Sequence, residues 1–444
     1  MLTLRLLQVY LFLLPLEELL GKLFGIDTMW KPYRVAAMLV AVVAVIELPY
    51  RKLDKYDKNF LAIFLTACGL SSISLIRGVP EPAFVLRTCV LVLIPISMYF
   101  CIKLNARTPA DLARLIRAFI LGAFVNACYG AYEAITLGHT WRPAGLSGAA
   151  APADLALHCG LAFAFVLYPY PGRRRATWLS VFVRVSAGAV LLFAVLVSGT
   201  RGAWLGLVFS TAALACVMAL SRSQRGRMLR VLAPATILIT VALVFKFAPL
   251  LKRAEGDLTD ALESRLAWDK DLQTGAGRTE IWGQALDIAS DYYFIGGGFS
   301  GFLQASYNHT SAFHGFNPAW LVEHGIGSHD VFLEVLIDYG PTSLLLLVAS
   351  LTTLIGSLFR KARDANRELS PHGMLYSLLF LIVCGLSRDL ISMPDFWIVM
   401  AFVTLFVRYR SCPAKARIES IISRGRINRY ANRMLVEVQS ERGL

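Results

Sequence analysis

The chain has 444 residues, of which 56% are hydrophobic and only 17% are charged. An ordinary soluble domain carries about 25% charged residues, and the mean hydropathy of +0.58 is also too high for one. Apolar stretches of about 20 residues recur along the whole chain, and each is long enough to cross a bilayer as a helix. A membrane barrel would show short alternating strands instead. The sequence therefore predicts an all-α polytopic membrane protein.

About twelve transmembrane helices are predicted. They cover approximately residues 5–24, 33–49, 59–77, 83–102, 112–137, 151–169, 178–199, 202–221, 231–250, 329–358, 372–388 and 391–408. Lysine and arginine concentrate in the short loops that follow the even-numbered helices, so these loops and both chain termini are expected in the cytoplasm. The net charge of +14 therefore reports membrane topology, and we expect no nucleic-acid partner.

The chain divides at its longest polar segment. Residues 1–250 are predicted to form helices 1–9, residues 251–328 a large extracytoplasmic loop with short helices, and residues 329–410 helices 10–12. Residues 411–444 form a basic cytoplasmic tail, which is either solvated or bound to anionic lipid headgroups. Because ordinary connections are much shorter, we expect the large loop to be functional.

One amphipathic helix is predicted within the large loop, from Glu280 to Asp291. Its Trp282 suits an interfacial position. If this helix lies on the membrane surface, it holds the preceding Arg278 at the depth of the lipid headgroups. Alternatively, the helix packs inside a small extracytoplasmic domain.

Two arginines stand at the edges of apolar segments. Arg201 lies between Gly199 and Gly202 in the turn that joins helices 7 and 8, and Arg278 follows Gly277 in the large loop. A cation at the edge of hydrocarbon usually has an anionic partner, and a guanidinium group binds two phosphate oxygens at once. Both arginines are therefore candidate pyrophosphate ligands. The alternatives are that Arg201 extends to water or pairs with a carboxylate, and that Arg278 is a surface residue.

His329 is the candidate general base. Ser328 is predicted to be the N-cap of helix 10, which makes His329 the first helical residue. The positive end of the helix dipole disfavours a charged imidazole, and a histidine can accept a proton as a general base only when its imidazole is neutral. The alternative is a histidine that only caps the helix. Further along, Gly340 and Pro341 are expected to kink or break helix 10.

Two further segments carry possible ligand contacts on the same face. Arg142 and Gly145 follow helix 5, and Arg388 and Asp389 close helix 11. Each charged group either contacts a ligand or forms a structural ion pair.

Together these motifs resemble the O-antigen ligase family, whose superfamily includes the O-antigen polymerases. The family pattern has an arginine after helix 7, matched by Arg201, and a G-R-x-x-x-W segment in a large periplasmic loop, matched by residues 277–282. It continues with H-[ND]-x-[FY]-L-x-x-L-x-x-x-G, which matches from His329 to Gly340, with Asp330 where Asn is usual. An R-x-x-G element is matched by Arg142 and Gly145.

The resemblance implies an enzyme of the bacterial inner membrane that needs neither a metal nor a nucleotide cofactor. Its donor would be O-antigen linked to undecaprenyl pyrophosphate, and its acceptor would be a sugar hydroxyl of lipid A–core oligosaccharide. The active site would face the periplasm, and membrane lipids would surround the protein. Taken with the candidates from the sequence itself, the residues expected to be catalytic or substrate-binding are His329, Arg278, Arg201, Arg142, Trp282, Arg388 and Asp389.

The mechanism implied is direct, inverting glycosyl transfer. Arg201 and Arg278 would bind the pyrophosphate and stabilise its developing charge, while His329 would deprotonate the acceptor. An O-antigen polymerase or a protein O-oligosaccharyltransferase would use the same donor, and the sequence leaves both open. A secondary transporter of a small anion is the alternative from another class, but it would favour ionisable residues at mid-span.

Overall fold

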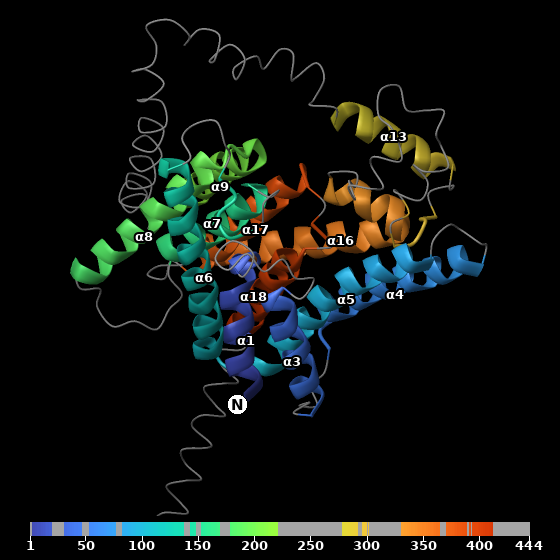
Figure 1. Ribbon diagram of the computed structural model, residues 1–444, viewed down its shortest axis with the longest axis horizontal. Helices are drawn as coiled ribbons and strands as arrows, with labels where there is room; N and C mark the ends of the chain where they lie inside the picture. Colours follow the sequence, from blue (N-terminus) through green and yellow to red (C-terminus); the bar gives the residue numbers. More distant parts are fainter. Residues whose placement is uncertain are drawn as a thin grey trace, which may run out of the picture.

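The computed structural model describes residues 2–19, 31–46, 53–76, 82–136, 143–147, 152–168, 178–220, 278–291, 295–299, 301, 330–364, 370–388, 390–391 and 393–411. Every regular element within these residues is a helix, as predicted (Figure 1). Three of the helices are long and apolar enough to cross a membrane by themselves, and several shorter apolar helices accompany them. The described part of the chain is thus all-helical, and its apolar helices indicate a membrane protein.

The helix bounds follow the predicted spans closely. The helices are α1 (Leu2–Leu13) with its continuation η1 (Leu14–Leu16), α3 (Pro32–Ile46), α4 (Lys55–Ile76), α5 (Pro82–Asn105), α6 (Pro109–Thr136), α7 (Pro152–Leu167), α8 (Trp178–Val197), α9 (Arg201–Leu220), α13 (Arg278–Asp291), α16 (Val331–Arg363), α17 (Ser370–Gly385) and α18 (Pro394–Ser411). The predicted span 231–250 lies outside the described residues, so the count of twelve stays a prediction.

The core of the bundle is built around α18. Residues 396–406 of this helix are each at most 2% exposed, because other helices cover it on every side, as an all-round apolar helix requires. Trp397 forms edge-to-face contacts with Phe60 of α4 and Tyr99 of α5, at centroid distances of 5.6 and 6.1 Å. These contacts fix α4 and α5 against the centre of the bundle.

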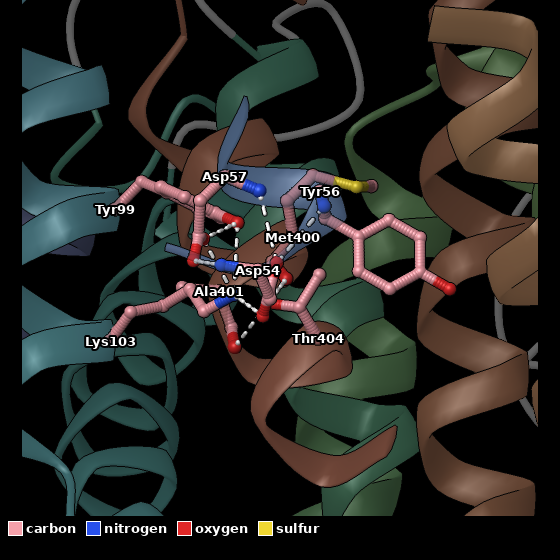
Figure 2. Close-up of polar contacts among 8 residues, drawn as sticks. All are labelled: Asp54, Tyr56, Asp57, Tyr99, Lys103, Met400, Ala401 and Thr404. Atoms are coloured by element: carbon pink, nitrogen blue, oxygen red, sulfur yellow. Dashed lines mark hydrogen bonds and ion pairs between the residues drawn. The ribbon is translucent and has the colours of Figure 1, made fainter. Parts of the chain in front are cut away.

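One end of the bundle is closed by a buried lysine (Figure 2). Lys103 of α5 is 3% exposed, and its Nζ lies 2.6 Å from both Asp54 Oδ2 and Asp57 Oδ1. Tyr99 donates a hydrogen bond of 2.8 Å to Asp57 Oδ1. Asp54 also caps α4, since its Oδ1 accepts from the backbone N–H groups of Tyr56 and Asp57. We call this the Lys103 end.

The C-terminal parts of α16 and α18 meet at the Lys103 end. Lys361 donates to Val407 O at 2.7 Å, and the Tyr409 hydroxyl donates to Ala106 O just beyond α5. The starts of α7, α9 and α18 and the end of α17 therefore gather at the opposite end, which we call the Arg388 end.

Helix α16 is broken, as its Gly-Pro pair predicts. Gly340 has φ 79° and ψ 170°, a conformation outside the helical region that suits glycine, and it divides α16 into residues 331–339 and 341–363. Val331 packs near Gly385 at the end of α17, where a Cβ on the glycine would lie 2.9 Å from Val331 Cγ1. Residues 331–339 therefore begin at the Arg388 end, and residues 341–363 continue from the break to the Lys103 end.

Candidate functional site

The end of α17 lies against the starts of two other helices, α9 and α16. Ser387 lies against Gly202, so closely that a Cβ on this glycine would be 2.2 Å from Ser387 Oγ. Cys384 Sγ contacts Gly202 O at 3.9 Å, and Gly385 meets Val331 at the start of α16. These close approaches bring the start of α9, with Arg201, beside the start of α16, with Asp330.

Arg201 is the first residue of α9 and is exposed. The turn before it is tight, as predicted: Gly199 has φ 69°, and Thr200 O accepts from the N–H groups of Ala203 and Trp204 at 3.1 and 3.2 Å. The indole N–H of Trp204 donates to Val195 O of α8. The turn is thus anchored on both sides, and Arg201 stands at the surface of the Arg388 end.

Arg388 forms an ion pair in the structure. Its Nη2 lies 2.5 Å from Asp154 Oδ1 in the first turn of α7, and the two side chains are 18% and 20% exposed. Arg388 Nη1 is buried and has no hydrogen-bond partner within the described part of the chain. The Asp154 carboxylate therefore holds Nη2 of this guanidinium, while Nη1 makes no hydrogen bond within the described residues. Asp389 lies outside the described residues.

The start of α16 differs from the prediction by two residues. Asp330, with φ −147° and ψ 123°, is the N-cap: its Oδ1 accepts from Phe332 N at 2.8 Å and Leu333 N at 3.0 Å. The expectation that Ser328 is the cap and His329 the first helical residue is wrong. A carboxylate at 330 takes the cap because its side chain reaches both free N–H groups. His329 comes just before the cap and lies outside the described residues.

The family pattern quoted above allows Asp or Asn at this capping position. Both are among the strongest N-cap residues. The cap at Asp330 also removes the argument that His329 is the first residue of a helix, so the helix dipole no longer accounts for an uncharged imidazole.

The predicted loop helix is present as α13, which starts at Arg278, two residues earlier than expected. It packs against α16 and is the outlying helix in Figure 1. Ala285 and Ala289 are buried in its contact face, at 0% and 1% exposure. Trp282 is partly exposed, although its Nε1 is buried. Packing on α16 sets the place of the backbone at Arg278, whose side chain is not among those described.

The R-x-x-G element belongs to a short loop that is buried in the bundle. All of residues 143–147 are buried. Asn126 of α6 accepts from Leu146 N and donates to Ser147 Oγ, both at 2.6 Å. Glu133 accepts from Gly145 N at 2.8 Å. These contacts fix the loop that follows Arg142, and Arg142 itself lies outside the described residues.

Behind this loop is a buried pair that the sequence analysis did not identify. His158 Nε2 lies 3.1 Å from Asp395 Oδ2, and each residue is 4% exposed. On its other side, His158 Nδ1 lies 3.5 Å from Ser147 Oγ. An ionisable residue inside an apolar helix is itself a signal of a functional or structural role, and His158 could have been found in that way.

The site thus has one described arginine at the surface, a second in an ion pair, and a capped helix start. Within the residues that the structure describes, no three His, Cys, Asp or Glu side chains are placed to hold a metal ion. The charged groups available there suit an anionic ligand.

Comparison with known proteins agrees with the family resemblance found in the sequence. The family model described as O-antigen ligase matches residues 186–348, and no curated protein matches the chain. The matched segment includes Arg201, Arg278, Trp282 and His329. Residues 186–348 of this membrane protein are thus similar to the O-antigen ligase family.

Proposed function

We propose that the protein transfers O-antigen from undecaprenyl pyrophosphate to a sugar hydroxyl of lipid A–core oligosaccharide. The observation that carries this proposal is the meeting of α9, α16 and α17 at the Arg388 end, which brings the surface residue Arg201 close to the segment that follows His329. In a bacterial inner membrane with cytoplasmic termini, this end faces the periplasm.

In this proposal the arginines hold the departing pyrophosphate. Arg201 begins α9, where the helix dipole adds to its positive charge. Arg278 begins α13, which packs on α16. As the bond from the sugar to the pyrophosphate oxygen breaks, negative charge grows on that oxygen, and guanidinium groups already in place stabilise it.

Arg388 extends the anion site. Asp154 holds Nη2, which leaves Nη1 as a hydrogen-bond donor for a phosphate oxygen. Arg142 and Asp389 would contact the sugars or the phosphates, and Trp282 would stack on a sugar ring. None of these contacts requires a metal or a nucleotide.

His329 would take the proton from the acceptor hydroxyl as that oxygen attacks the anomeric carbon. One displacement of this kind inverts the configuration at that carbon. Because His329 precedes the Asp330 cap, its proton affinity would be set by the nearby arginines and the substrate phosphates rather than by the helix dipole.

The test is transfer in vitro with purified protein, lipid-linked O-antigen and lipid A–core, in the presence of a chelator. We expect core-linked polymer on a gel, an inverted anomeric centre, and full activity with the chelator. Arg201→Ala and His329→Ala should each lose transfer by about a hundredfold or more. The matched control is Arg114→Ala, since Arg114 is an exposed arginine, 57% exposed, at the opposite end of the bundle.

Four outcomes would contradict the proposal. Loss of transfer with the chelator would require a metal. Extension of one lipid-linked glycan by another, without transfer to the core, would identify a polymerase, and transfer to a protein would identify an O-oligosaccharyltransferase. Uptake of a small anion into vesicles without any glycan transfer would identify a transporter.

A further inference from the structure

The break in α16 leaves a backbone acceptor without its helical partner. In an unbroken helix, Ile337 O would accept from the N–H of residue 341. Residue 341 is proline and has no N–H. This carbonyl must therefore find another donor.

Residues 295–299, which follow α13 after only three residues, supply that donor. Gly297 N donates to Ile337 O at 2.7 Å, and Gly298 N donates to Asp338 O at 2.8 Å. The approach is close, since a Cβ on Gly340 would lie 2.2 Å from Ile295 O. The loop backbone thus completes the hydrogen bonding of the broken helix.

A serine from α4 holds the other side of this segment. Phe299 N donates to Ser71 Oγ at 2.7 Å, and Ser71 is 6% exposed. Gly298 has φ 86°, and a Cβ there would lie 2.6 Å from Ser71 N, so only glycine fits. The Phe299 ring packs against Phe64 and Tyr339, each at 5.9 Å.

We propose that Ser71, with residues 295–299 and the break at Gly340, forms a clamp that sets the position of Arg278 relative to His329. The clamp joins residues 295–299, which follow α13, to α16, which begins two residues after His329 in the sequence. Ser71 anchors both to α4. Ser71 is therefore a positioning residue: it touches no substrate and acts through the backbone of residues 295–299. This inference rests on the proposed function, because it concerns the spacing of Arg278 and His329, which act as catalytic groups only in that proposal.

The test compares Ser71→Ala with Ser72→Ala. Ser72, the next residue of α4, is exposed. Among the described contacts, its hydroxyl donates only to Cys68 O of the same helix. Hydrogen exchange is measured on the peptide that contains residues 295–301. Transfer is measured with the lipid-linked donor and lipid A–core, and kcat and KM are determined separately. Thermal unfolding is recorded for each variant.

We expect Ser71→Ala to speed exchange in residues 295–301 and to lower kcat by about tenfold, because catalytic groups that are misplaced by about 1 Å lose much of their effect. The KM for the donor should change less than twofold, since Arg201 still binds the pyrophosphate. Ser71→Thr, which restores a hydroxyl, should recover part of the loss. Ser72→Ala should leave exchange, kcat and unfolding temperature unchanged.

The clamp is overturned if Ser71→Ala speeds exchange without lowering kcat, or if it changes neither quantity. It is also overturned if Ser71→Ala and Ser72→Ala lower activity in parallel with their unfolding temperatures, because Ser71 would then be only a stabilising residue. A wild-type protein that transfers no glycan would instead refute the proposed function, and the positioning role with it. Faster exchange in Ser71→Ala would still show that the contact itself exists.

Discussion

Arg388, at the end of α17, reaches Asp154 in the first turn of α7, where Nη2 and Oδ1 lie 2.5 Å apart. This pair connects α7 to the end of α17, although Asp154 and Arg388 are separated by about half the length of the chain. It also leaves Nη1 without a hydrogen-bond partner among the described residues. Asp154 thereby determines which face of the guanidinium is presented to a ligand.

We expect Asp154→Asn to weaken this pair. The free energy of unfolding should fall by about 1–3 kcal/mol, between the values for exposed and buried pairs, and the KM for the lipid-linked donor should rise. Asp364→Asn is the matched control, because the Arg363–Asp364 pair is 51% and 65% exposed. Similar results for both variants, in chemical unfolding and in kinetics, would argue against a positioned Arg388.

The close contact between Gly202 and Ser387 predicts that the activity lost in Gly202→Ala can be restored in part by a second substitution. Gly202→Ala would place a methyl group 2.2 Å from Ser387 Oγ, so either the Ser387 side chain or the start of α9 must shift. We expect α9 to shift and to displace Arg201, which should lower transfer about tenfold. The second substitution Ser387→Ala removes that oxygen and should restore part of the activity. Gly356→Ala is the control, since nothing lies within 4 Å of a Cβ there. If the double variant is no better than Gly202→Ala, this contact does not position Arg201.

The cap at Asp330 can be tested by replacing the carboxylate. Asp330→Asn keeps an acceptor for Phe332 N and Leu333 N and should remain nearly as stable as the wild type. Asp330→Ala should lower the free energy of unfolding by about 1 kcal/mol. Thermal unfolding in detergent measures the stability of both variants. Equal losses for Asn and Ala would mean that the side chain at 330 has a role other than capping.

The buried pair of His158 and Asp395 should be important for stability. His158→Ala leaves a carboxylate inside the bundle that has lost its partner, which should cost about 3 kcal/mol or more. In a double-mutant cycle with Asp395→Asn, the second substitution should add little to the first. Simple additivity of the two losses would show that the 3.1 Å contact contributes nothing.

Asp54 gives a stability that depends on pH. Burial raises the pKa of this carboxyl, but the charge of Lys103 and the hydrogen bonds from Lys103, Tyr56 and Asp57 outweigh burial and hold the pKa below its ordinary value. A lowered pKa stabilises the fold at pH values above the unfolded pKa of about 3.9, and this stabilisation is lost as the pH falls through the lowered value.

Wild-type protein should therefore be more stable than Asp54→Asn at pH 7, and the difference should shrink below about pH 4. Unfolding temperatures measured from pH 7 to pH 3 test this. A difference that stays constant over the whole range would show that the charge of Asp54 contributes no stability.

The sequence predicted the helices well because length and apolar composition determine them. It also predicted the break in α16, since glycine followed by proline cannot continue a helix. The N-cap was wrong because Ser328 and Asp330 are both good capping residues. Only the backbone shows which of the two has extended dihedral angles.

The polar contacts around the site could not be predicted, because their partners are far apart in sequence. His158 and Asp395 are separated by 237 positions, and Ser71 and Phe299 by 228. Hydropathy indicates that a helix crosses the membrane but not which helix lies beside it. Only a packed structure brings such residues together.

The dependence of residues 295–299 on both Ser71 and the broken helix has a consequence for biosynthesis. The ribosome makes Ser71 long before this segment, but Ile337 and Asp338 only some forty residues after it. The segment cannot complete its hydrogen bonds until translation has passed Pro341. We therefore expect residues 295–299 to become resistant to proteolysis only late, and nascent chains truncated before residue 331 to be cleaved readily in this segment.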